Sequence, residues 1–207
     1  MILAEPLRLL VEGRDDQAVL RTLMQRHQFG PCPQLRQLDG VDRLLEALPV
    51  ALKSSDLERL GVIVDADTSL NARWQAVRSA LLTSGYAQVP TSPDPSGTVL
   101  LQEGLPVVGI WLMPDNRVPG MLEDFIRFMV PIEDDMWDIA ETAVSAIPSA
   151  KRRFPTARRA KAVAHTWLAW QEEPGRPFGT AITAHYLDAE APIVQALLRW
   201  LHRVFAG

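Results

Sequence analysis

Short apolar runs alternate with helix-like patterns over roughly the first 130 residues of the chain. The runs at 7–11, 60–64 and 107–112 are almost continuously apolar, which is typical of strands buried on both faces of a parallel sheet. In the stretch 18–24 the apolar positions recur at a spacing that places them on one face of a helix. The pattern predicts an α/β protein with a mainly parallel sheet flanked by helices.

The remaining elements follow from the same patterns and from the positions of glycine and proline. We expect strands at 34–38 and 99–101, the second as the edge of a β-hairpin, and a helix near 42–52 that Pro49 kinks or breaks. Further helices are predicted at 71–83, 121–129, 133–147, 156–170 and 191–205, with loops at 89–97 and 175–179. Residues 1–130 should form the α/β core, and residues 131–207 a helical extension packed on it as one compact unit.

Acidic side chains stand shortly after each of the three main apolar runs. They are Glu12, Asp15 and Asp16 after the first run, Asp65 and Asp67 after the second, and Asp115, Glu123 and Asp124 after the third. The carboxyl ends of parallel strands share one edge of a sheet, so these clusters should converge on one crevice. Like charges at a few ångströms repel strongly, and a hard divalent cation, Mg²⁺ or Mn²⁺, is their simplest partner. We expect a metal site that draws on Glu12, Asp16, Asp65, Asp67, Glu123 and Asp124.

Several of these acids also have a simpler structural interpretation. Asp15 and Asp16 are good helix N-caps, and for Asp15 that is the expected role. Asp115 is a turn former first, and Asp124 could serve only the N-terminus of a helix. Asp65 and Asp67 stand two apart on an extended chain end, so their side chains should point the same way and share or bridge an ion.

The distribution of charge is more informative than the net charge of −4. The stretch 151–161 contains no acid and six basic residues, which are Lys151, Arg152, Arg153, Arg158, Arg159 and Lys161. A basic strip beside an acidic metal pocket is the layout expected when a polyanion is cut by metal chemistry. We expect the first five of these residues to contact DNA or RNA; a solvated helix face is the alternative interpretation.

Composition places the chain in a broad class. The single cysteine, Cys32, excludes an intramolecular disulfide and fits a reducing compartment. We find neither a signal-peptide pattern nor an apolar window of membrane-spanning length, so we expect a cytoplasmic protein without a membrane partner. Among the tryptophans, Trp167, Trp170 and Trp200 are expected to pack the helical end onto the sheet.

Two motifs in the chain resemble the signature of the Toprim domain. One strand ends in Glu12-Gly13 with Asp16 three residues beyond the glycine, and another ends in Asp65-x-Asp67. The third cluster, Gly120-x-Leu122-Glu123-Asp124, is more similar to the overcoming-lysogenization-defect nucleases than to the topoisomerases. The chain also resembles a family of small stand-alone Toprim-related proteins near those nucleases. The resemblance covers roughly residues 7–130.

The resemblance implies a Rossmann-like Toprim core and a Mg²⁺- or Mn²⁺-dependent nuclease. In family terms Glu12 is a general acid/base and Asp65 acts with the metal. Nucleases of this branch also use a lysine C-terminal to the acids, for which Lys161 is the first candidate and Lys151 and Arg153 are alternatives. Gly13 would let the chain turn sharply and approach a phosphate.

Other functions fit the sequence less well or compete with the nuclease. Thr68 stands where topoisomerases and primases commonly have glycine after Asp-x-Asp, and a zinc module and larger core for a primase are absent from the 207 residues. A non-catalytic module that binds nucleic acid remains the competing hypothesis. Because related nucleases carry an ATPase on the same chain, a separately encoded ATPase partner is a further expectation.

Overall fold

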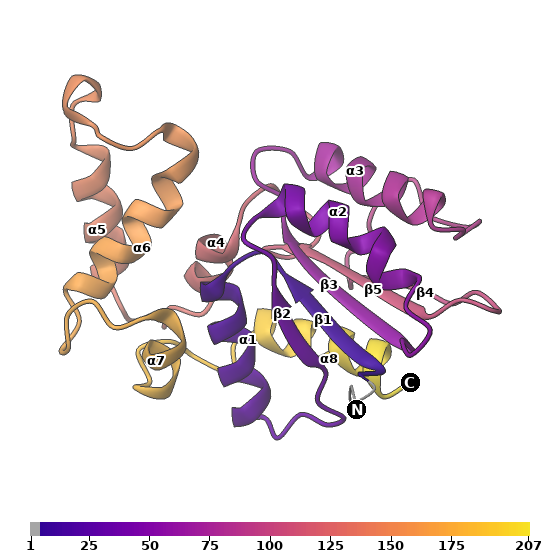
Figure 1. The fold of residues 1–207 in the computed structure, drawn as a ribbon. Coiled ribbons are helices and arrows are strands. Elements are labelled where there is room, and N and C mark those ends of the chain that lie inside the picture. The colour runs from indigo at the N-terminus through magenta and orange to yellow at the C-terminus, as the bar shows by residue number, and fades with distance from the viewer. Residues whose placement is uncertain (1–4) are drawn as a thin grey trace.

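The computed structural model describes residues 5–207 and contains a five-stranded sheet between two layers of helices (Figure 1). The strands are β1 (Leu7–Val11), β2 (Gln34–Gln37), β3 (Arg59–Asp65), β4 (Thr98–Leu100) and β5 (Val107–Met113). Their order is β2-β1-β3-β5-β4, and only β4 runs antiparallel to its neighbour. The predicted mainly parallel sheet with an antiparallel edge is therefore confirmed.

Alternation along the central strands divides the core into two apolar layers. Leu10, Val62 and Ile110 lie on the face covered by α2 (Val41–Leu52) and α3 (Leu70–Thr83). The residues next to these in each strand, such as Ile63 and Trp111, point to the other face. They belong to the layer covered by α1 (Arg14–Arg26) and α8 (Pro192–Phe205). Since successive side chains of a strand point to opposite faces, a strand covered on both faces must be apolar at every position.

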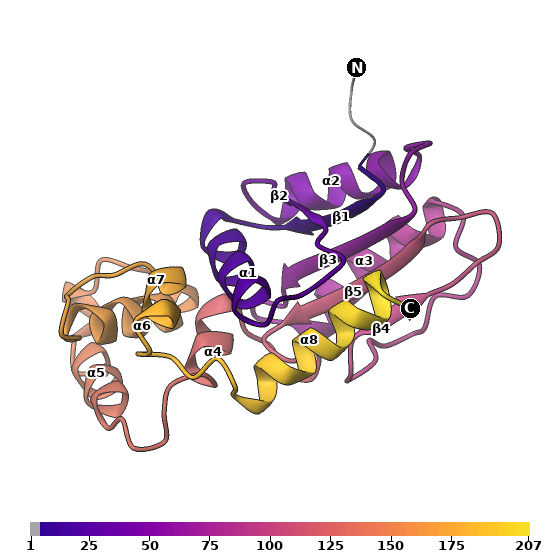
Figure 2. The same ribbon diagram turned by 90° about the horizontal axis from the view of Figure 1, so that it is seen from below.

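Two glycines explain why α8 packs closely on the sheet. Gly61 and Gly109 are partners in neighbouring strands. A Cβ atom on Gly109 would lie 2.1 Å from Val204 Cγ2, and one on Gly61 would lie 3.0 Å from Cζ of Phe205. Because these two positions lack side chains, α8 can lie close to the sheet, along which it runs (Figure 2).

The rest of the helices form a projection beside the carboxyl edge of the sheet (Figures 1 and 2). They are α4 (Leu122–Arg127), α5 (Met136–Ser145), the 3₁₀ turns η1 (Ser149–Lys151) and η2 (Thr156–Arg158), α6 (Arg159–Ala169) and α7 (Phe178–Thr183). We call residues 136–169 the helical arm. Its two long helices pack through Trp137 and Trp167, whose ring centroids lie 5.6 Å apart.

The structure corrects the expectation of a loop at 175–179, because α7 begins at Phe178 and includes Gly179. A Cβ atom at Gly179 would lie 3.1 Å from Thr22 Oγ1 and 3.2 Å from the Ala18 carbonyl oxygen on α1. This glycine therefore permits close helix packing rather than marking a turn.

The structure excludes a break in α2 and corrects the expected packing of the tryptophans. The helix α2 does not break at Pro49 and continues to Leu52, since a proline in the last turn removes one N–H bond there without stopping the chain. Only one of the three tryptophans joins the helical end to the sheet: Trp200 packs against Trp111, Trp167 packs within the arm, and Trp170 is 41% exposed.

Within residues 5–207, no helix is long and apolar enough to cross a membrane.

Candidate acidic site at the carboxyl edge of the sheet

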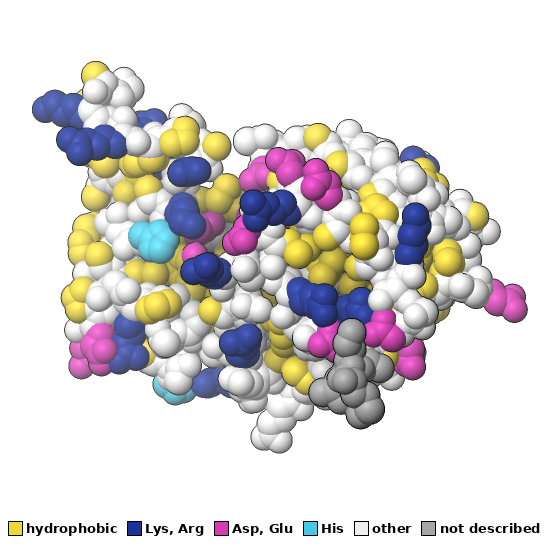
Figure 3. Space-filling view, viewed as in Figure 1, with side chains coloured by type: hydrophobic (Ala, Val, Ile, Leu, Met, Phe, Trp, Pro, Cys, Tyr) yellow, Lys and Arg dark blue, Asp and Glu magenta, His cyan; other side chains and the backbone are white. Residues whose placement is uncertain are grey.

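Four of the predicted acids line one cavity of about 400 Å³ at the carboxyl edge of the sheet. They are Asp16, Asp65, Asp67 and Glu123, joined there by Gly13, Arg14, Asp15, Arg158 and Lys161. We call this cavity the acidic pocket. Figure 3 shows acidic side chains and Lys and Arg side chains gathered beside the hollow between the helical projection and the sheet. The predicted convergence of the three clusters is a direct result of the parallel topology.

Glu12 lies behind the pocket and connects the ends of β1 and β3. Its Oε1 atom accepts a hydrogen bond of 2.8 Å from the backbone N–H of Asp65. The Asp65 carboxylate in turn accepts, through Oδ1, a 3.1 Å bond from the Leu122 N–H at the start of α4. A chain of hydrogen bonds therefore fixes Glu12 and Asp65 between three segments that are far apart in the sequence.

Asp16 is a buried acid that also completes the first turn of α1. Its side chain is 7% exposed, and Oδ2 accepts a 3.1 Å bond from the N–H of Gly13, which precedes the helix. The N-terminal bond was expected for Asp15 first, but Asp15 instead lies 3.8 Å from Lys161 Nζ. The chain bends at Glu12 and Gly13 between β1 and α1, as expected, but Gly13 has an extended backbone, φ −136° and ψ 179°, that does not require glycine. A Cβ atom there would lie 3.2 Å from the Asp16 carboxylate.

Asp67 departs from the extended geometry predicted for Asp65-x-Asp67. Its φ of +52° puts it in the left-handed region, where a non-glycine residue costs roughly 1–2 kcal/mol. The conformation is held by a 2.8 Å bond from its N–H to the Gly120 carbonyl and by Arg73, whose Nη2 lies 2.5 Å from Asp67 Oδ2. Both aspartates nevertheless line the acidic pocket.

Arg73 itself was not predicted as a site residue. Besides binding Asp67, it donates from Nε to the Asp65 carbonyl oxygen over 2.7 Å. In the sequence only its position, one turn into α3, hinted at a role in the site. That position predicts a contact with Asp67 only once the path of the turn between β3 and α3 is known.

Glu123 and Lys161 close the pocket on the side of the helical projection. Glu123 sits in the first turn of α4 with 5% of its surface exposed, and Lys161 Nζ lies 3.5 Å from its Oε1 atom. Lys161 belongs to the first turn of α6. Its ammonium group thus stands between Glu123 and Asp15, within reach of a ligand in the pocket.

Two acids of the third cluster have structural bonds. Asp124 Oδ2 accepts a 2.8 Å bond from the Met121 N–H at the start of α4, and Asp124 does not line the acidic pocket. Asp115 Oδ1 accepts from the N–H groups of Arg117 and Val118, as a turn former does. A metal-binding role for Asp124 stays a prediction that this geometry does not favour.

The basic strip divides into three groups. Arg158 and Lys161 line the acidic pocket, together with Arg14 at the start of α1. Arg159 instead braces the arm, because its Nη2 atom lies 2.9 Å from Glu141 and 2.8 Å from Ser145 on α5. Lys151, Arg152 and Arg153 lie in the connection between α5 and α6, outside the pocket lining. Arg14 escaped the sequence analysis because it stands among acids.

Burial and mutual repulsion raise the pKa values of Glu12, Asp16 and Asp65. Burial raises the pKa of Asp65 well above its usual range, and the neighbouring Asp16, Glu12 and Glu123 add to that shift. Burial, followed by the nearby Glu12, raises the pKa of Asp16 to about 7. The pKa of Glu12 is also raised by burial, although the bond from the Asp65 N–H opposes the shift. A cation in the pocket would relieve this unfavourable electrostatic energy.

The acidic side chains of the pocket suit a hard divalent ion by the type of their donor atoms, but not by their present geometry. All are carboxylate oxygens, as Mg²⁺ prefers, and Asp16 and Asp65 each give one oxygen to a backbone N–H. Within the described chain, however, no three Asp, Glu, His or Cys side chains already stand in a geometry that would hold an ion. Binding at Asp16, Asp65 and Glu123 would therefore require these side chains to rotate toward one another.

Comparison with known proteins gives a family and no function. No curated protein and no solved structure matches the chain. One family model, described as "Protein of unknown function (DUF3226)", matches residues 6–206. This range takes in every strand of the sheet, the acidic pocket and the whole helical projection. The chain therefore belongs to the DUF3226 family.

Proposed function

We propose that this protein is a divalent-metal-dependent phosphodiesterase that cuts nucleic acid, built on a Toprim-type sheet. One observation carries the proposal: acids that follow three adjacent parallel strands meet in a single pocket whose rim is cationic. A purely acidic crevice would repel phosphate, so the combination favours catalysis on a polyanion in the presence of a metal. The adjacent ends of β1 and β3, which bear Glu12 and Asp65, support the Toprim interpretation.

Each side chain has a defined part in such a reaction. Asp16, Asp65 and Glu123 would hold the metal, and Asp67 would assist from the position that Arg73 gives it. Mg²⁺ or Mn²⁺, when bound, supplies charge neutralisation on the phosphoryl group and lowers the pKa of the attacking water. Glu12, whose pKa is raised by burial, would act as the general acid/base of the reaction.

The cations at the rim act on the substrate rather than on the metal. Arg14 and Arg158 are exposed and would hold flanking phosphates of the strand. Lys161 is placed to stabilise negative charge that develops during cleavage, because its ammonium group is next to the buried Glu123. Lys161 is thus favoured over Lys151 and Arg153 as the basic residue that assists catalysis, since neither of those lines the pocket.

The matched pair Lys161→Ala and Lys151→Ala tests this assignment. With Mg²⁺ or Mn²⁺ present, Lys161→Ala should lower the cleavage rate of an end-labelled oligonucleotide by roughly 10²-fold while weakening binding much less. Lys151→Ala should leave the rate within about twofold of the unaltered protein. Equal losses of rate and affinity in Lys161→Ala would reduce Lys161 to a phosphate anchor.

A second function is favoured by a specific feature of the pocket. The oxygens of Glu12, Asp16 and Asp65 are already bonded to backbone N–H groups, as they would be in a site that is purely structural. A non-catalytic module that binds nucleic acid or docks a separately encoded ATPase would share this feature. It is distinguished by oligonucleotide binding that needs no metal and is never followed by cleavage.

A further inference from the structure

A second cavity, of about 470 Å³, lies against the loop 114–120, and the residues directly after this loop line the acidic pocket. Asp115 and Arg117 of this loop line the second cavity, whereas Met121 and Leu122, directly after the loop, line the acidic pocket. The backbone between Arg117 and Leu122 can span at most about 18 Å. A ligand that crosses the loop could therefore occupy both cavities.

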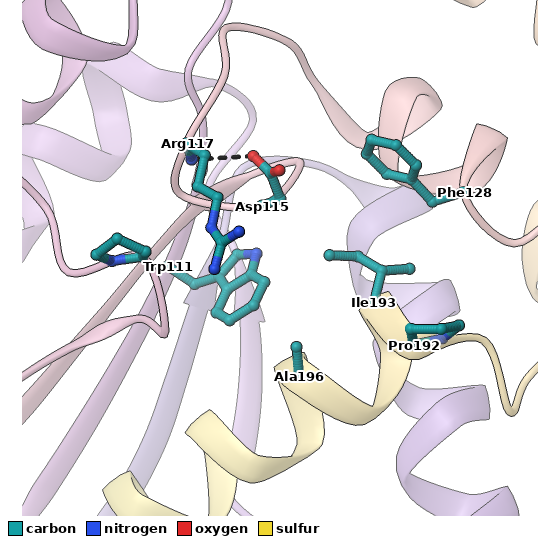
Figure 4. Close-up of a pocket in the computed structure, with 8 residues that line it drawn as sticks. Trp111, Asp115, Arg117, Phe128, Pro192, Ile193 and Ala196 are labelled. Carbon is teal, nitrogen blue, oxygen red and sulfur yellow. Dashed lines mark hydrogen bonds between the residues drawn. The ribbon is translucent and has the colours of Figure 1, made fainter.

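The walls of the second cavity are mostly apolar. Phe128, Pro192 and Ile193 lie at one side, and Trp111, which is fully buried, lies at the other (Figure 4). We call this cavity the aromatic pocket. Phe128 is 49% exposed at the end of α4, so its ring offers an uncovered face toward a ligand. The volume lies within the range of roughly 300–1,000 Å³ that small-molecule sites occupy.

One cation at this apolar site, Arg117, has no ion-pair partner among the described residues. Figure 4 shows the Arg117 side chain directed toward Trp111. Among residues 5–207, its guanidinium group makes neither an ion pair nor a hydrogen bond. The only acid of the lining, Asp115, uses Oδ1 to bind two backbone N–H groups of its own turn. The pocket therefore suits a flat aromatic group that carries a negative charge beside it.

We propose that the aromatic pocket takes an unstacked base of the nucleic acid, with Arg117 on an adjacent phosphate. The inference rests on the proposed function, because it assigns a second contact to the strand that the acidic pocket would cut. A base can enter such a pocket only when it is unpaired. The substrate class is therefore single-stranded nucleic acid, or a duplex with a frayed end, gripped a few nucleotides from the cleaved bond.

The test uses the Asp65→Asn protein in EDTA, so that binding is measured without cleavage. The fluorescent single strand is first shortened to the minimum length that keeps full affinity, so that it can bind in only one register. The base at each position of this strand is then removed in turn. One abasic position should weaken binding by roughly tenfold, as expected for the loss of one stacked base. Phe128→Ala should weaken binding of the intact strand to a similar extent and remove the penalty at that position.

Matched controls keep the result interpretable. Ile139 is as exposed as Phe128, at 49%, but lies on α5 of the helical arm, so Ile139→Ala should change nothing. Phe128→Trp should retain the abasic penalty, which excludes a folding defect at this position. Arg117→Gln should weaken binding of every strand and lower the slope of affinity against salt by about one phosphate contact.

The outcomes separate this proposal from the proposed function. An abasic penalty that persists in Phe128→Ala, or duplex binding as tight as single-strand binding, overturns the aromatic-pocket assignment even if metal-dependent cleavage is found. Pocket-dependent binding without any cleavage by the unaltered protein in Mn²⁺ overturns the nuclease and leaves the pocket. Failure to bind any strand, in EDTA and also with Mn²⁺ present, overturns both.

Discussion

The two ends of the same sheet treat their carboxylates in opposite ways. At the amino end, Asp56 is surrounded by donors: Arg8 Nη2 at 2.7 Å, Ser54 Oγ at 2.6 Å and the Glu5 N–H at 3.1 Å. These hydrogen bonds, that of Ser54 first, hold the pKa of Asp56 well below its usual range. At the carboxyl end, Asp16 and Asp65 face other acids, and burial raises the pKa of both.

At neutral pH the fold gains stability from the carboxylate at the amino end of the sheet and loses stability at the carboxyl end. A carboxylate that is ionised more readily in the folded protein stabilises it at neutral pH, whereas one that resists ionisation destabilises it there. Clusters of the second kind persist at sites that bind or react. The acidic pocket therefore lowers the stability of the folded protein at neutral pH. Asp56, at the other end of the sheet, serves as the control carboxylate in the experiments below.

Exchanging one acid at each end should give opposite results, with the largest effect on activity. Asp65→Asn should lower metal-dependent cleavage by at least about 100-fold and, in EDTA at neutral pH, should raise the free energy of unfolding by roughly 1 kcal/mol, or about 2–4 °C in Tm. Asp56→Asn should retain activity but lower Tm by several degrees. Cleavage assays and thermal melts of both variants measure this. If Asp65→Asn lowers Tm as Asp56→Asn does, the carboxylates at the two ends of the sheet do not differ in their effect on stability.

A smaller, roughly tenfold effect should separate two neighbouring arginines of the basic strip. Arg158→Glu, at the rim of the acidic pocket, should weaken oligonucleotide binding at low salt and leave Tm unchanged. Arg159→Glu should lower Tm, because it opposes Glu141 at the arm, and should affect binding less. Fluorescence anisotropy across a salt series, with melts of both proteins, checks the pair. Equal losses of affinity would return both residues to one continuous binding strip.

The pH dependence of stability should show the raised pKa values directly. Burial raises the pKa of Asp16 to about 7 and that of Asp65 well above its usual range, whereas both groups titrate near pH 4 in the unfolded chain. Stability in EDTA should therefore fall as pH rises from about 4 to about 7. The change should be on the order of 2 kcal/mol, measured by urea unfolding. Asp65→Asn should flatten the curve, and saturating Mg²⁺ should do the same. A rise of stability over this window would contradict the pKa shifts assigned to the pocket.

The sequence could predict the acidic pocket because a parallel sheet leaves little choice. Runs such as Leu60–Val64 identify buried strands, and parallel pairing then brings the residues at the carboxyl end of each strand to one edge. The fold class and the closeness of Asp65 to Glu12 follow from this rule. The parallel topology does not predict what the pocket binds. The DNA or RNA substrate, the ATPase partner and the Mg²⁺ or Mn²⁺ cofactor remain proposals.

What the sequence could not show depends on packing between distant segments. Arg158 and Arg159 are identical in type, and only the contact between α5 and α6 pairs one with Glu141. Arg73 becomes a site residue because Asp67 turns back toward α3. The aromatic pocket joins Trp111 to Phe128 and Ile193 from three separate elements, so no local pattern indicated it.

Metal binding by the acidic pocket is the central claim, and thermal unfolding with and without divalent ions tests it most directly. At neutral pH, saturating Mg²⁺ or Mn²⁺ should raise Tm of the unaltered protein by roughly 5–10 °C, as expected for an ion at about 100 times its Kd. Asp56→Asn should keep this gain, and Asp65→Asn should lose most of it. If Tm does not move at millimolar ion, or moves equally in Asp65→Asn, the acids at the carboxyl edge do not form a metal site and the nuclease proposal fails with them.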